Sequence, residues 1–319
     1  MRRGWSRFKS GKKCQASSKS LLSTTVKRKS RYWQEWTTED FSTKTLTEAV
    51  AVLPIGAIEA HGPHLPLGTD AMHNAALLDK ALNQLPDRCT VLALPPFQVG
   101  VSCEHSAFAG TLQLSAETAL KAWFDVANCV RTAGISKLVI YNSHGGNHPL
   151  AEVLARRVRH DLNMLCLLAM NLGDVSACIS SLFPQEEAKF GIHGGALETS
   201  LMLALKPELV RMQKAQNFSS SASHFQTDKS TIRIHQPGFA NKIGWLAQDL
   251  NLNGVVGDAT LSDAEKGQAL ADAAATAFAD ILIQVHDANI KDILSDHSSA
   301  LYQPQGPPII PKKGRLPQQ

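Results

Sequence analysis

The feature that most constrains the fold is the alternation of short apolar runs with longer amphipathic segments through most of the chain. Apolar runs of strand length are followed by segments in which Leu and Ala recur at helical spacing, and this order repeats. Strands are expected within residues 46–58, 91–100, 137–141 and 164–170, and helices within 70–84, 116–134, 149–162, 197–209 and 262–290. Because strands that alternate with helices form right-handed βαβ units, we predict a layered α/β/α fold with a mainly parallel sheet.

The two ends of the chain differ in composition from this alternating part. Residues 1–34 carry eleven Lys or Arg and no acid, and residues 303–319 are basic and rich in Pro. We therefore predict a basic arm over 1–34, a single α/β domain over 35–290 and a Pro-rich basic tail over 291–319. For the arm, an organelle transit peptide, a nucleic-acid or anionic-surface arm and an upstream start included in the reading frame remain open. A solvated, disordered tail is the default.

The net charge of +4 comes from the arm. Without it the chain has 21 basic residues against 28 acidic ones, which argues against nucleic acid as a partner of the folded part. No apolar run reaches the about 18 residues that a membrane span needs, so no membrane partner is expected. Six cysteines show no CxxC pair and no regular spacing, which predicts free thiols in a reducing compartment. We expect a cytoplasmic protein unless the arm directs it to an organelle.

Side chains that carry chemistry gather in IEAHGPHLPLGTD, residues 58–70, directly after the first apolar run. Glu59 and His61 are two residues apart, so extended backbone sends both side chains to the same side. Asp70 stands just before a helix, where its carboxylate can offer one oxygen to each of two cations about 3.5–4 Å apart. Burying such acids without a compensating partner is unfavourable, and imidazole with carboxylate suits Zn, Mn or Fe.

Two further segments present the same residue types at the end of a strand or the start of a helix. His144 lies in YNSHGGN after the third apolar run, and His193 and Glu198 lie in HGGALETS. In open parallel sheets such residues meet at the carboxyl ends of the strands. The sequence therefore predicts a metal site there, with His64 and His73 as structural residues or as partners of the ligands.

Several segments together resemble the creatininase (creatinine amidohydrolase) family across about residues 33–285, in the same order along the chain. They are LPIGAIEAHGPHLPLGTDA, GVSCEHSAFAGTLQL, YNSHGGN, HGGALETS and GWLAQDLNLNGVVGDATLSDAEKG. The resemblance implies an amidohydrolase with two divalent metal ions per chain on a layered α/β fold, assembled as a homo-oligomer. It implies that Glu59, Asp70 and His144 hold one ion. His61 and Asp70 would hold the second, with Asp70 bridging.

The chain departs from creatininase proper at two positions. In that enzyme the second ion also takes a glutamate two residues after the strand-end histidine, whereas this chain has Gly146. Our hypothesis is that Glu198 supplies the missing carboxylate. A tryptophan that covers the substrate in creatininase proper, four residues before the histidine matching His193, is Lys189 here. The NSHGGN form resembles other branches of the family, which include formamide deformylases and a peptide-cleaving maturation enzyme, so we expect an amide other than creatinine.

The expected reaction is hydrolysis of a C–N amide bond in a small substrate, linear or cyclic, through a water that the metal ions activate. His193 is expected to donate a proton to the leaving nitrogen, since imidazole titrates near working pH, and Glu198 is an alternative as the general base. Glu104 and His105 either line the substrate pocket or form a salt-linked pair within their loop. Two rival functions stay open: a deformylase or peptidase that uses the same metals, and a catalytically inactive metal-binding scaffold.

Overall fold

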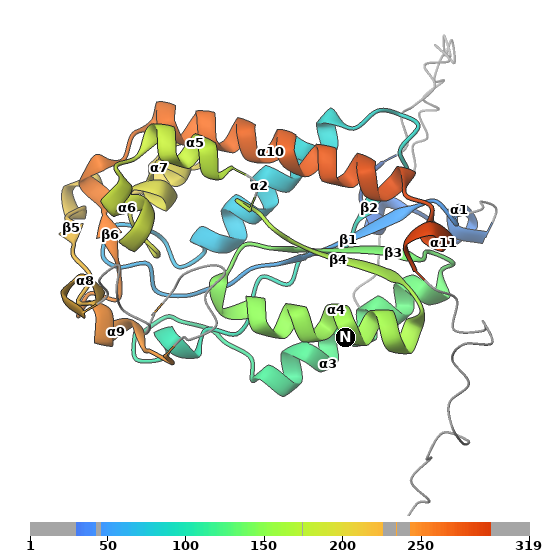
Figure 1. Cartoon of the computed structure of the whole chain (residues 1–319), viewed down its shortest axis with the longest axis horizontal. Helices are drawn as coiled ribbons and strands as arrows, with labels where there is room; N and C mark the ends of the chain where they lie inside the picture. Colours follow the sequence, from blue (N-terminus) through green and yellow to red (C-terminus); the bar gives the residue numbers. More distant parts are fainter. Residues whose placement is uncertain (1–29, 43–45, 174, 226–233, 235–242, 295–319) are drawn as a thin grey trace, which may run out of the picture.

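The computed structural model describes residues 30–42, 46–173, 175–225, 234 and 243–294. Its centre is a four-stranded parallel sheet with the strand order β2-β1-β3-β4 (Figure 1). The strands are β1 (Val50–Ile55), β2 (Val91–Ala93), β3 (Lys137–Asn142) and β4 (Leu165–Met170). Because all four strands run in the same direction, their carboxyl ends lie at the same end of the sheet.

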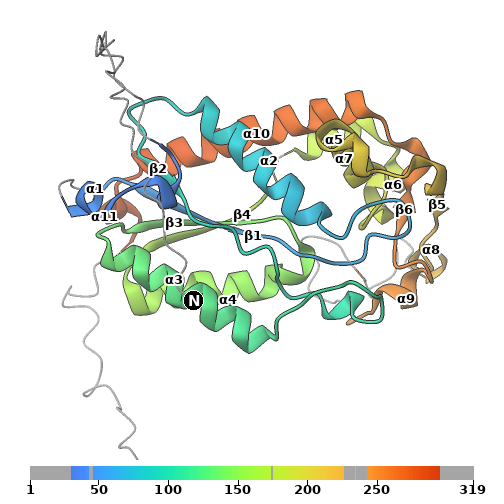
Figure 2. The same ribbon diagram turned by 180° about the vertical axis from the view of Figure 1, so that it is seen from behind.

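Four long helices cover the two faces of this sheet. They are α2 (Thr69–Gln84), α3 (Ala116–Thr132), α4 (His148–Leu162) and α10 (Ala264–Asp287). The helices α3 and α4 lie on one face, and α2 and α10 lie on the other, as two opposite views show (Figures 1 and 2). The predicted layered α/β/α fold with a mainly parallel sheet is confirmed.

Strand β1 supplies side chains to both layers in alternation. Leu53 lies in the core that contains Trp123 of α3, whereas its neighbour Val52 lies in the opposite core with Phe278 of α10. Tyr141 of β3 stacks on the ring of Phe278 with a centroid distance of 4.0 Å. A strand that is buried on both faces favours apolar residues on both, which is why β1 and residues 138–141 of β3 appear in the sequence as continuous apolar runs.

Local signals in the sequence set the limits of the helices. The Ser115 side chain caps α3 by accepting a hydrogen bond from the Thr118 amide, and Gly134 follows the helix with a φ of 91°. The Asp263 side chain caps α10 by accepting from the amide of Glu265. Ser and Asp suit this position because their oxygens satisfy N–H groups that have no partner within the helix.

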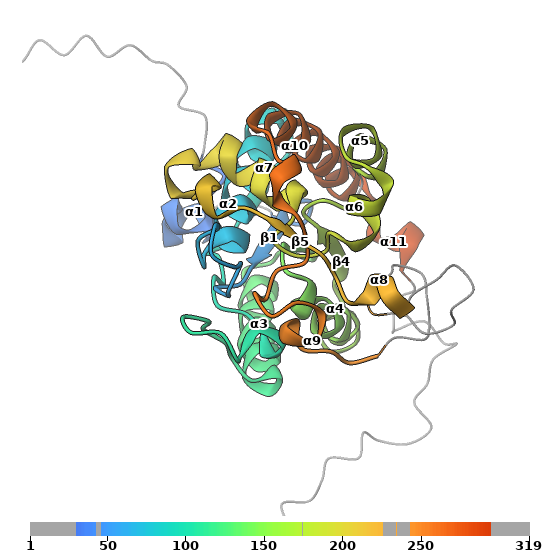
Figure 3. The ribbon, with the colours of Figure 1, turned by 90° about the vertical axis from the view of Figure 1, so that its left-hand side faces the viewer.

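Shorter elements gather beyond the carboxyl ends of the strands (Figure 3). They are α5 (Ser176–Leu182), α6 (Gln185–Phe190), α7 (Ala196–Leu205), α8 (Ala222–Phe225), α9 (Ala247–Leu250) and the antiparallel pair β5 (Asn217–Phe218) and β6 (Gly257–Asp258). The remaining elements are α1 (Thr38–Ser42), α11 (Ile290–Ile293) and 3-10 turns at Trp33–Glu35, Cys103–His105, Gly145–Asn147, Pro207–Leu209, Met212–Lys214 and Ala259–Leu261. Leu201 of α7 packs with Leu77 of α2 and Leu270 of α10, which fixes α7 to the main body.

Several predicted elements are shorter in the structure; the strand expected within residues 91–100 is β2, which ends at Ala93. The strand expected within residues 46–58 ends at Ile55, and the chain then follows an irregular path to the start of α2. The helix expected over 197–209 is α7, which ends at Leu205 ahead of a separate turn at Pro207–Leu209. Pro207 cannot donate a helical hydrogen bond, so the helix stops before it.

The last residues of the predicted basic arm pack against the domain. Tyr32 pairs with Ala93 at the outer edge of β2, and the Arg31 guanidinium donates hydrogen bonds to the carbonyl oxygens of Cys89 and Leu85. The division into arm, domain and tail stays a prediction, because residues 1–29 and 295–319 lie outside the described residues.

By length and composition, α10 could cross a membrane, and it is the one helix among the described residues that passes this test. Its apolar side is used within the fold, since Phe278 and Leu282 pack with β1 and β3 and Leu270 packs with α7. The helix is therefore a core element of the α/β domain.

Candidate metal centre

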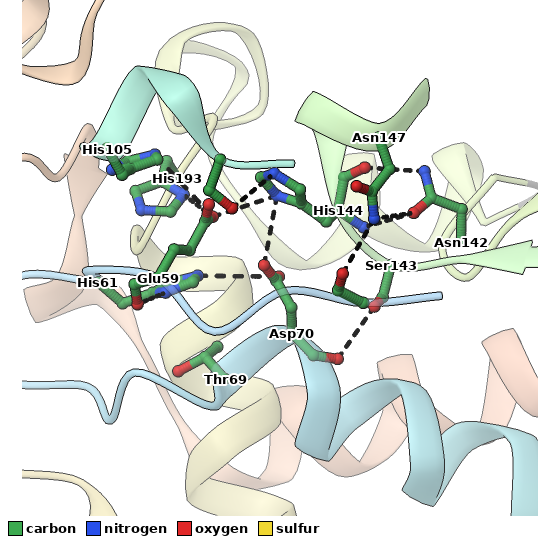
Figure 4. A network of polar contacts seen from close by, with 12 residues as sticks. Glu59, His61, Thr69, Asp70, His105, Asn142, Ser143, His144, Asn147 and His193 are labelled. Atoms are coloured by element: carbon green, nitrogen blue, oxygen red, sulfur yellow. Dashed lines mark hydrogen bonds and ion pairs between the residues drawn. The ribbon is translucent and has the colours of Figure 1, made fainter. Parts of the chain in front are cut away.

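Four of the sequence-predicted ligands meet at the carboxyl ends of β1 and β3 (Figure 4). Glu59 and His61 lie in the irregular segment after β1, Asp70 is the second residue of α2, and His144 follows β3 directly. All four side chains belong to residues that are at most 4% exposed. Two acids and two imidazoles thus share a site that water barely reaches.

The first candidate metal position consists of Glu59, Asp70 and His144. The Nδ1 atom of His144 lies 3.1 Å from Oε1 of Glu59 and 3.4 Å from Oδ2 of Asp70. On the other side of the ring, Nε2 lies 2.9 Å from the carbonyl oxygen of Val101. A carbonyl oxygen can only accept, so a neutral His144 carries its proton on Nε2 and presents the lone pair of Nδ1 to two carboxylates. A proton or a metal cation between these atoms is needed to remove the repulsion between the Nδ1 lone pair and the two carboxylates.

The second candidate position consists of His61, Asp70 and Glu198. The Nε2 atom of His61 lies 3.8 Å from Oδ1 of Asp70 and 3.7 Å from Oε2 of Glu198. The Nδ1 atom of His61 lies 3.1 Å from the carbonyl oxygen of Glu59, so its Nε2 lone pair also faces the acids. Asp70 therefore directs one carboxylate oxygen toward each position. In both groups the possible ligand atoms lie within 4.8 Å of one another.

The hydrogen bonding of the centre fits a divalent metal. Both carboxylate oxygens of Glu59, Oδ2 of Asp70 and Nε2 of His61 are buried, and while His144 Nδ1 carries no proton none of them has a hydrogen-bond partner among the described residues. Buried polar atoms in proteins are almost always paired, because an unpaired one loses its hydration without compensation. The orphaned atoms are oxygens and imidazole nitrogens, the donor set that suits Zn, Mn or Fe.

Neighbouring charges shift the pKa values of the buried acids and of His144 in the direction opposite to the effect of burial. Burial raises the pKa of Glu59, but His144 outweighs it and leaves that pKa below its ordinary value. Burial likewise raises the pKa of Asp70, yet His61 and the other nearby imidazoles hold it well below its usual range. Burial lowers the pKa of His144, but Glu59 and Asp70 hold it well above its usual range. Before metal binds, a proton on His144 therefore balances the two acids.

Three imidazole rings lie close together on one side of the centre, each tilted against its neighbour. The ring of His193 lies between those of His61 and His105, with centroid distances of 4.1 Å to each. The Nε2 atom of His193 lies 2.8 Å from the carbonyl oxygen of Ala60, and Nδ1 lies 3.6 Å from Oε1 of Glu59. Burial and the neighbouring His193 lower the pKa of His105 to about 3, so His105 is neutral at physiological pH.

Glu104 and His105 contact different members of the centre. Glu104 Oε1 lies 3.5 Å from Nε2 of His144, and His105 Nε2 lies 3.9 Å from Oε1 of Glu59. The space for Glu104 depends on Gly146, because a Cβ atom there would lie 2.3 Å from Glu104 Oε1 and 2.5 Å from His144 Nε2. The structure thus places the Glu104 carboxylate where a side chain at position 146 would otherwise start. Whether Glu104 and His105 bind substrate stays a prediction.

The two histidines left open by the sequence have separate surroundings. His73 contacts the centre, with Nε2 3.3 Å from Oδ1 of Asp70. The His64 side chain places Nε2 3.0 Å from Oγ1 of Thr199 in α7 and stacks on the ring of Phe218 in β5.

Asparagines of the YNSHGGN segment position the centre, and sequence reasoning assigned them no role. The Asn142 side chain donates to the carbonyl oxygen of His144 and accepts from its amide. The Asn147 side chain donates to the carbonyl oxygen of Gly56 and accepts from the amide of Val101. Their only signal in the sequence was their place on either side of the predicted ligand.

Comparison with known protein families gives one family match, to the model described as "Creatininase: Creatinine amidohydrolase", over residues 34–282. A mycofactocin precursor peptide peptidase of Mycobacterium ulcerans is 33% identical over 164 residues, which are 50% of this chain and 59% of that protein. The creatinine amidohydrolase of Pseudomonas putida is 28% identical over 181 residues, 52% of this chain and 68% of that enzyme. The chain therefore matches about three fifths of the mycobacterial relative.

Solved structures share the fold at lower sequence identity. A crystal structure of creatinine amidohydrolase (creatininase) superposes with a TM-score of 0.64 at 23% identity, covering 82% of this chain and 100% of that one. A structure named as the manganese form of creatininase has the same TM-score at 22% identity and covers the same shares. These similarities establish the layered arrangement of the domain.

Proposed function

This chain belongs to the creatininase family, and from that premise we propose that it hydrolyses a C–N amide bond with the help of two divalent metal ions. The observation that carries the proposal is the placement of Asp70 between two groups of ligands. Its two oxygens face His61 on one side and His144 on the other, at 3.8 and 3.4 Å. A single carboxylate split in this way suits a pair of metal ions.

In this proposal Glu59, Asp70 and His144 hold one ion, and His61, Asp70 and Glu198 hold the other. Divalent cations bound there would supply a water molecule of lowered pKa and a positive charge beside the amide carbonyl. The protein keeps the site dry and holds both ligand imidazoles with their lone pairs inward, through the carbonyl oxygens of Val101 and Glu59. We propose Zn, Mn or Fe as the native metal on the donor set alone.

His193 is our candidate for the group that protonates the leaving nitrogen. Its Nε2 faces the carbonyl oxygen of Ala60, so the proton that it can give up is the one on Nδ1, toward Glu59. Burial lowers the pKa of His193, but Glu59 and Glu198 more than offset this and raise it. In the metal-free chain this raised pKa favours the protonated imidazole.

The substrate that we propose is a small amide, and similarity to the mycobacterial peptidases favours a peptide as the second candidate. Metal-free protein would be reloaded with Mn or Zn and offered creatinine, N-formyl amines and short peptides, with released amine as the readout. Metal-dependent release from one of these classes is expected. No release from any class, with both metals bound, would support the inactive scaffold instead.

Two further features of the working protein are proposals. We propose a homo-oligomer, which size-exclusion chromatography with light scattering can measure. We also propose a reducing, cytoplasmic setting; the five cysteines among the described residues are free.

Glu198→Gln is expected to reduce the metal content from two ions per chain to one. The amide keeps the size of the side chain and loses the charge that the second position requires. Elemental analysis of the dialysed protein measures this directly. Glu208→Gln, an exposed site just beyond the same helix, is the control and should retain both ions. Two ions at full affinity in Glu198→Gln would remove Glu198 from the ligand set.

The affinity for the first ion is expected to rise with pH. Because the pKa of His144 lies well above its usual range, the metal-free imidazole is protonated at neutral pH and must release that proton to bind metal. Below that raised pKa, affinity should fall by about tenfold for each unit of falling pH, and above it affinity should level off. Glu59 and Asp70 release no proton in this range because their pKa values are lowered. Calorimetry in buffers of different ionisation enthalpy would measure the number of protons released when metal binds. An affinity that stays constant between pH 6 and 8 would contradict the prediction.

A further inference from the structure

We propose that Asn171 and His73 form a hydrogen-bonded relay that fixes oxygen Oδ1 of Asp70, and that this relay controls metal binding at the second position selectively. The second position is the group His61, Asp70 and Glu198. The inference rests on the proposed dinuclear site and adds two residues that set the properties of one half of it.

The relay joins three buried side chains in a line. Nδ2 of Asn171 lies 2.7 Å from Nδ1 of His73, and Nε2 of His73 lies 3.3 Å from Oδ1 of Asp70. Asn171 is 5% exposed, His73 1% and Asp70 2%, so water offers no alternative partner. Asn171 follows β4 and His73 lies on α2, and the contact connects two segments that are 98 residues apart in sequence.

The chemistry of the two ends fixes the direction of every hydrogen bond in the relay. Asp70 binds metal as a carboxylate, and a carboxylate can only accept a hydrogen bond. His73 must therefore donate from Nε2, which leaves Nδ1 as the acceptor when the ring is neutral. The amide group of Asn171 meets that need, since Nδ2 is a donor. If the Asn171 amide were turned the other way, its oxygen would require the proton of a neutral His73 on Nδ1. The unprotonated Nε2 would then face the carboxylate of Asp70.

The backbone at both ends of the relay is held independently of it. The Asn171 amide donates to the carbonyl oxygen of Asn142 at 2.9 Å, which continues the pairing of β3 with β4. The Ser143 hydroxyl donates to the carbonyl oxygen of Asp70 at 3.0 Å. Losing the relay would therefore free the carboxylate of Asp70 to rotate while its backbone stays in place.

Selectivity follows from which oxygen the relay touches. His73 contacts Oδ1 of Asp70, the oxygen that faces His61. The other oxygen, Oδ2, faces His144 and receives no contact from His73 among the described residues. A hydrogen bond to one oxygen of a metal-binding carboxylate orients it for its ion, and loss of such an outer partner typically weakens metal affinity by about 10–100-fold. The loss should fall on the second position.

The test measures the two metal affinities of the full-length chain with Mn²⁺ alone, by competition with a chelator, and needs no substrate. His73→Phe keeps a ring and removes both hydrogen bonds, and Asn171→Ala removes only the outer one. We expect both variants to weaken one of the two sites by about 10–100-fold and to change the other by less than about threefold. His73→Gln, whose amide can still donate to Asp70, should recover most of the loss. Electron paramagnetic resonance at equal Mn²⁺ per chain should show weaker spin coupling between the two Mn ions in the variants that lose affinity.

The matched control is Asn74→Ala. Asn74 is the next residue on α2, is 2% exposed, and donates its side-chain hydrogen bonds to the carbonyl oxygens of Ile55 and Tyr141 in the sheet. Its loss should lower thermal stability and leave both Mn²⁺ affinities unchanged. If Asn74→Ala weakens metal binding as much as the relay variants do, the relay is only structural and the inference is overturned.

Other results separate failure of the relay from failure of the proposed function. Unchanged affinities in Asn171→Ala and His73→Phe, or equal weakening of both sites, overturn the relay. If His73→Phe fails to fold, Asn171→Ala and His73→Gln decide alone, since each retains more of the native contacts. A wild-type chain that binds fewer than two ions removes the dinuclear site and the relay with it. Two bound ions without hydrolysis of any amide refute the proposed activity and leave the relay standing.

Discussion

Asp70→Asn is expected to bind neither metal ion tightly and to lose hydrolytic activity by more than about 100-fold. Removing a residue that only hydrogen-bonds to a metal ligand typically costs up to about 100-fold, and removing a shared ligand should cost more. Asp70 is the one side chain shared by both candidate positions, with Oδ1 toward His61 and Oδ2 toward His144. Its replacement removes a negative charge from both positions at once. The amide nitrogen of the new side chain would also donate a hydrogen bond to Nε2 of His61 or Nδ1 of His144, and that nitrogen could then no longer bind metal.

The same substitution should leave the metal-free protein folded. The new amide can donate to an imidazole nitrogen that otherwise faces only acceptors, and it removes a buried charge. Thermal melting in the presence of a chelator should match that of the wild type, whereas added metal should stabilise only the wild type. Asp79→Asn, an exposed site on the same helix, is the control. A variant at position 70 that still binds two ions would show that the acid does not bridge.

The second large effect is expected from adding one methyl group, in Gly146→Ala. A Cβ atom at this position would lie 2.3 Å from Oε1 of Glu104, 2.5 Å from Nε2 of His144 and 2.6 Å from the carbonyl oxygen of Val101. Carbon atoms do not approach so closely, and the last of these neighbours is backbone. His144 must therefore move, and a displacement of about 1 Å at a catalytic site can reduce activity about 100-fold. Loss of metal from the first position should accompany the loss of activity.

The neighbouring glycine provides the control for this experiment. A Cβ atom at Gly145 meets no atom of the described residues within 4 Å, so Gly145→Ala should behave like the wild type. The double variant Gly146→Ala with Glu104→Ala relieves the contact with the carboxylate but not that with the Val101 carbonyl, and should recover only part of the activity. Activity and metal content of Gly146→Ala equal to those of Gly145→Ala would contradict the packing described around His144.

The layered fold was predictable because the main strands and helices have recognisable patterns in their own local sequence. The strand β1 and residues 138–141 of β3 are buried on both faces and form continuous apolar runs, and α3 and α10 have side chains that cap their first turns. The elements β5 and β6 have two residues each, and α6 only six, so their sequences hold too little pattern to detect. Contacts with the rest of the molecule define these elements. The strand order β2-β1-β3-β4 likewise depends on which helices fit each face.

The candidate centre was predictable as far as its ligands lie within compact motifs. Glu59, His61 and Asp70 share one segment of the chain, and His144 stands at a strand end where such residues collect. The partners of these ligands could not be found in the same way. Asn171 reaches His73 across 98 residues, and no local pattern links the two. The sequence placed Lys189 where creatininase proper has a covering tryptophan, and the substrate consequence of that change stays a proposal.

The close packing of Gly146 against Glu104 also limits how sites of this kind can diverge. A side chain at position 146 and the acid at position 104 compete for the same volume. A lineage that acquires a carboxylate at one of these positions must first give up the one at the other, or shift the loop that carries it.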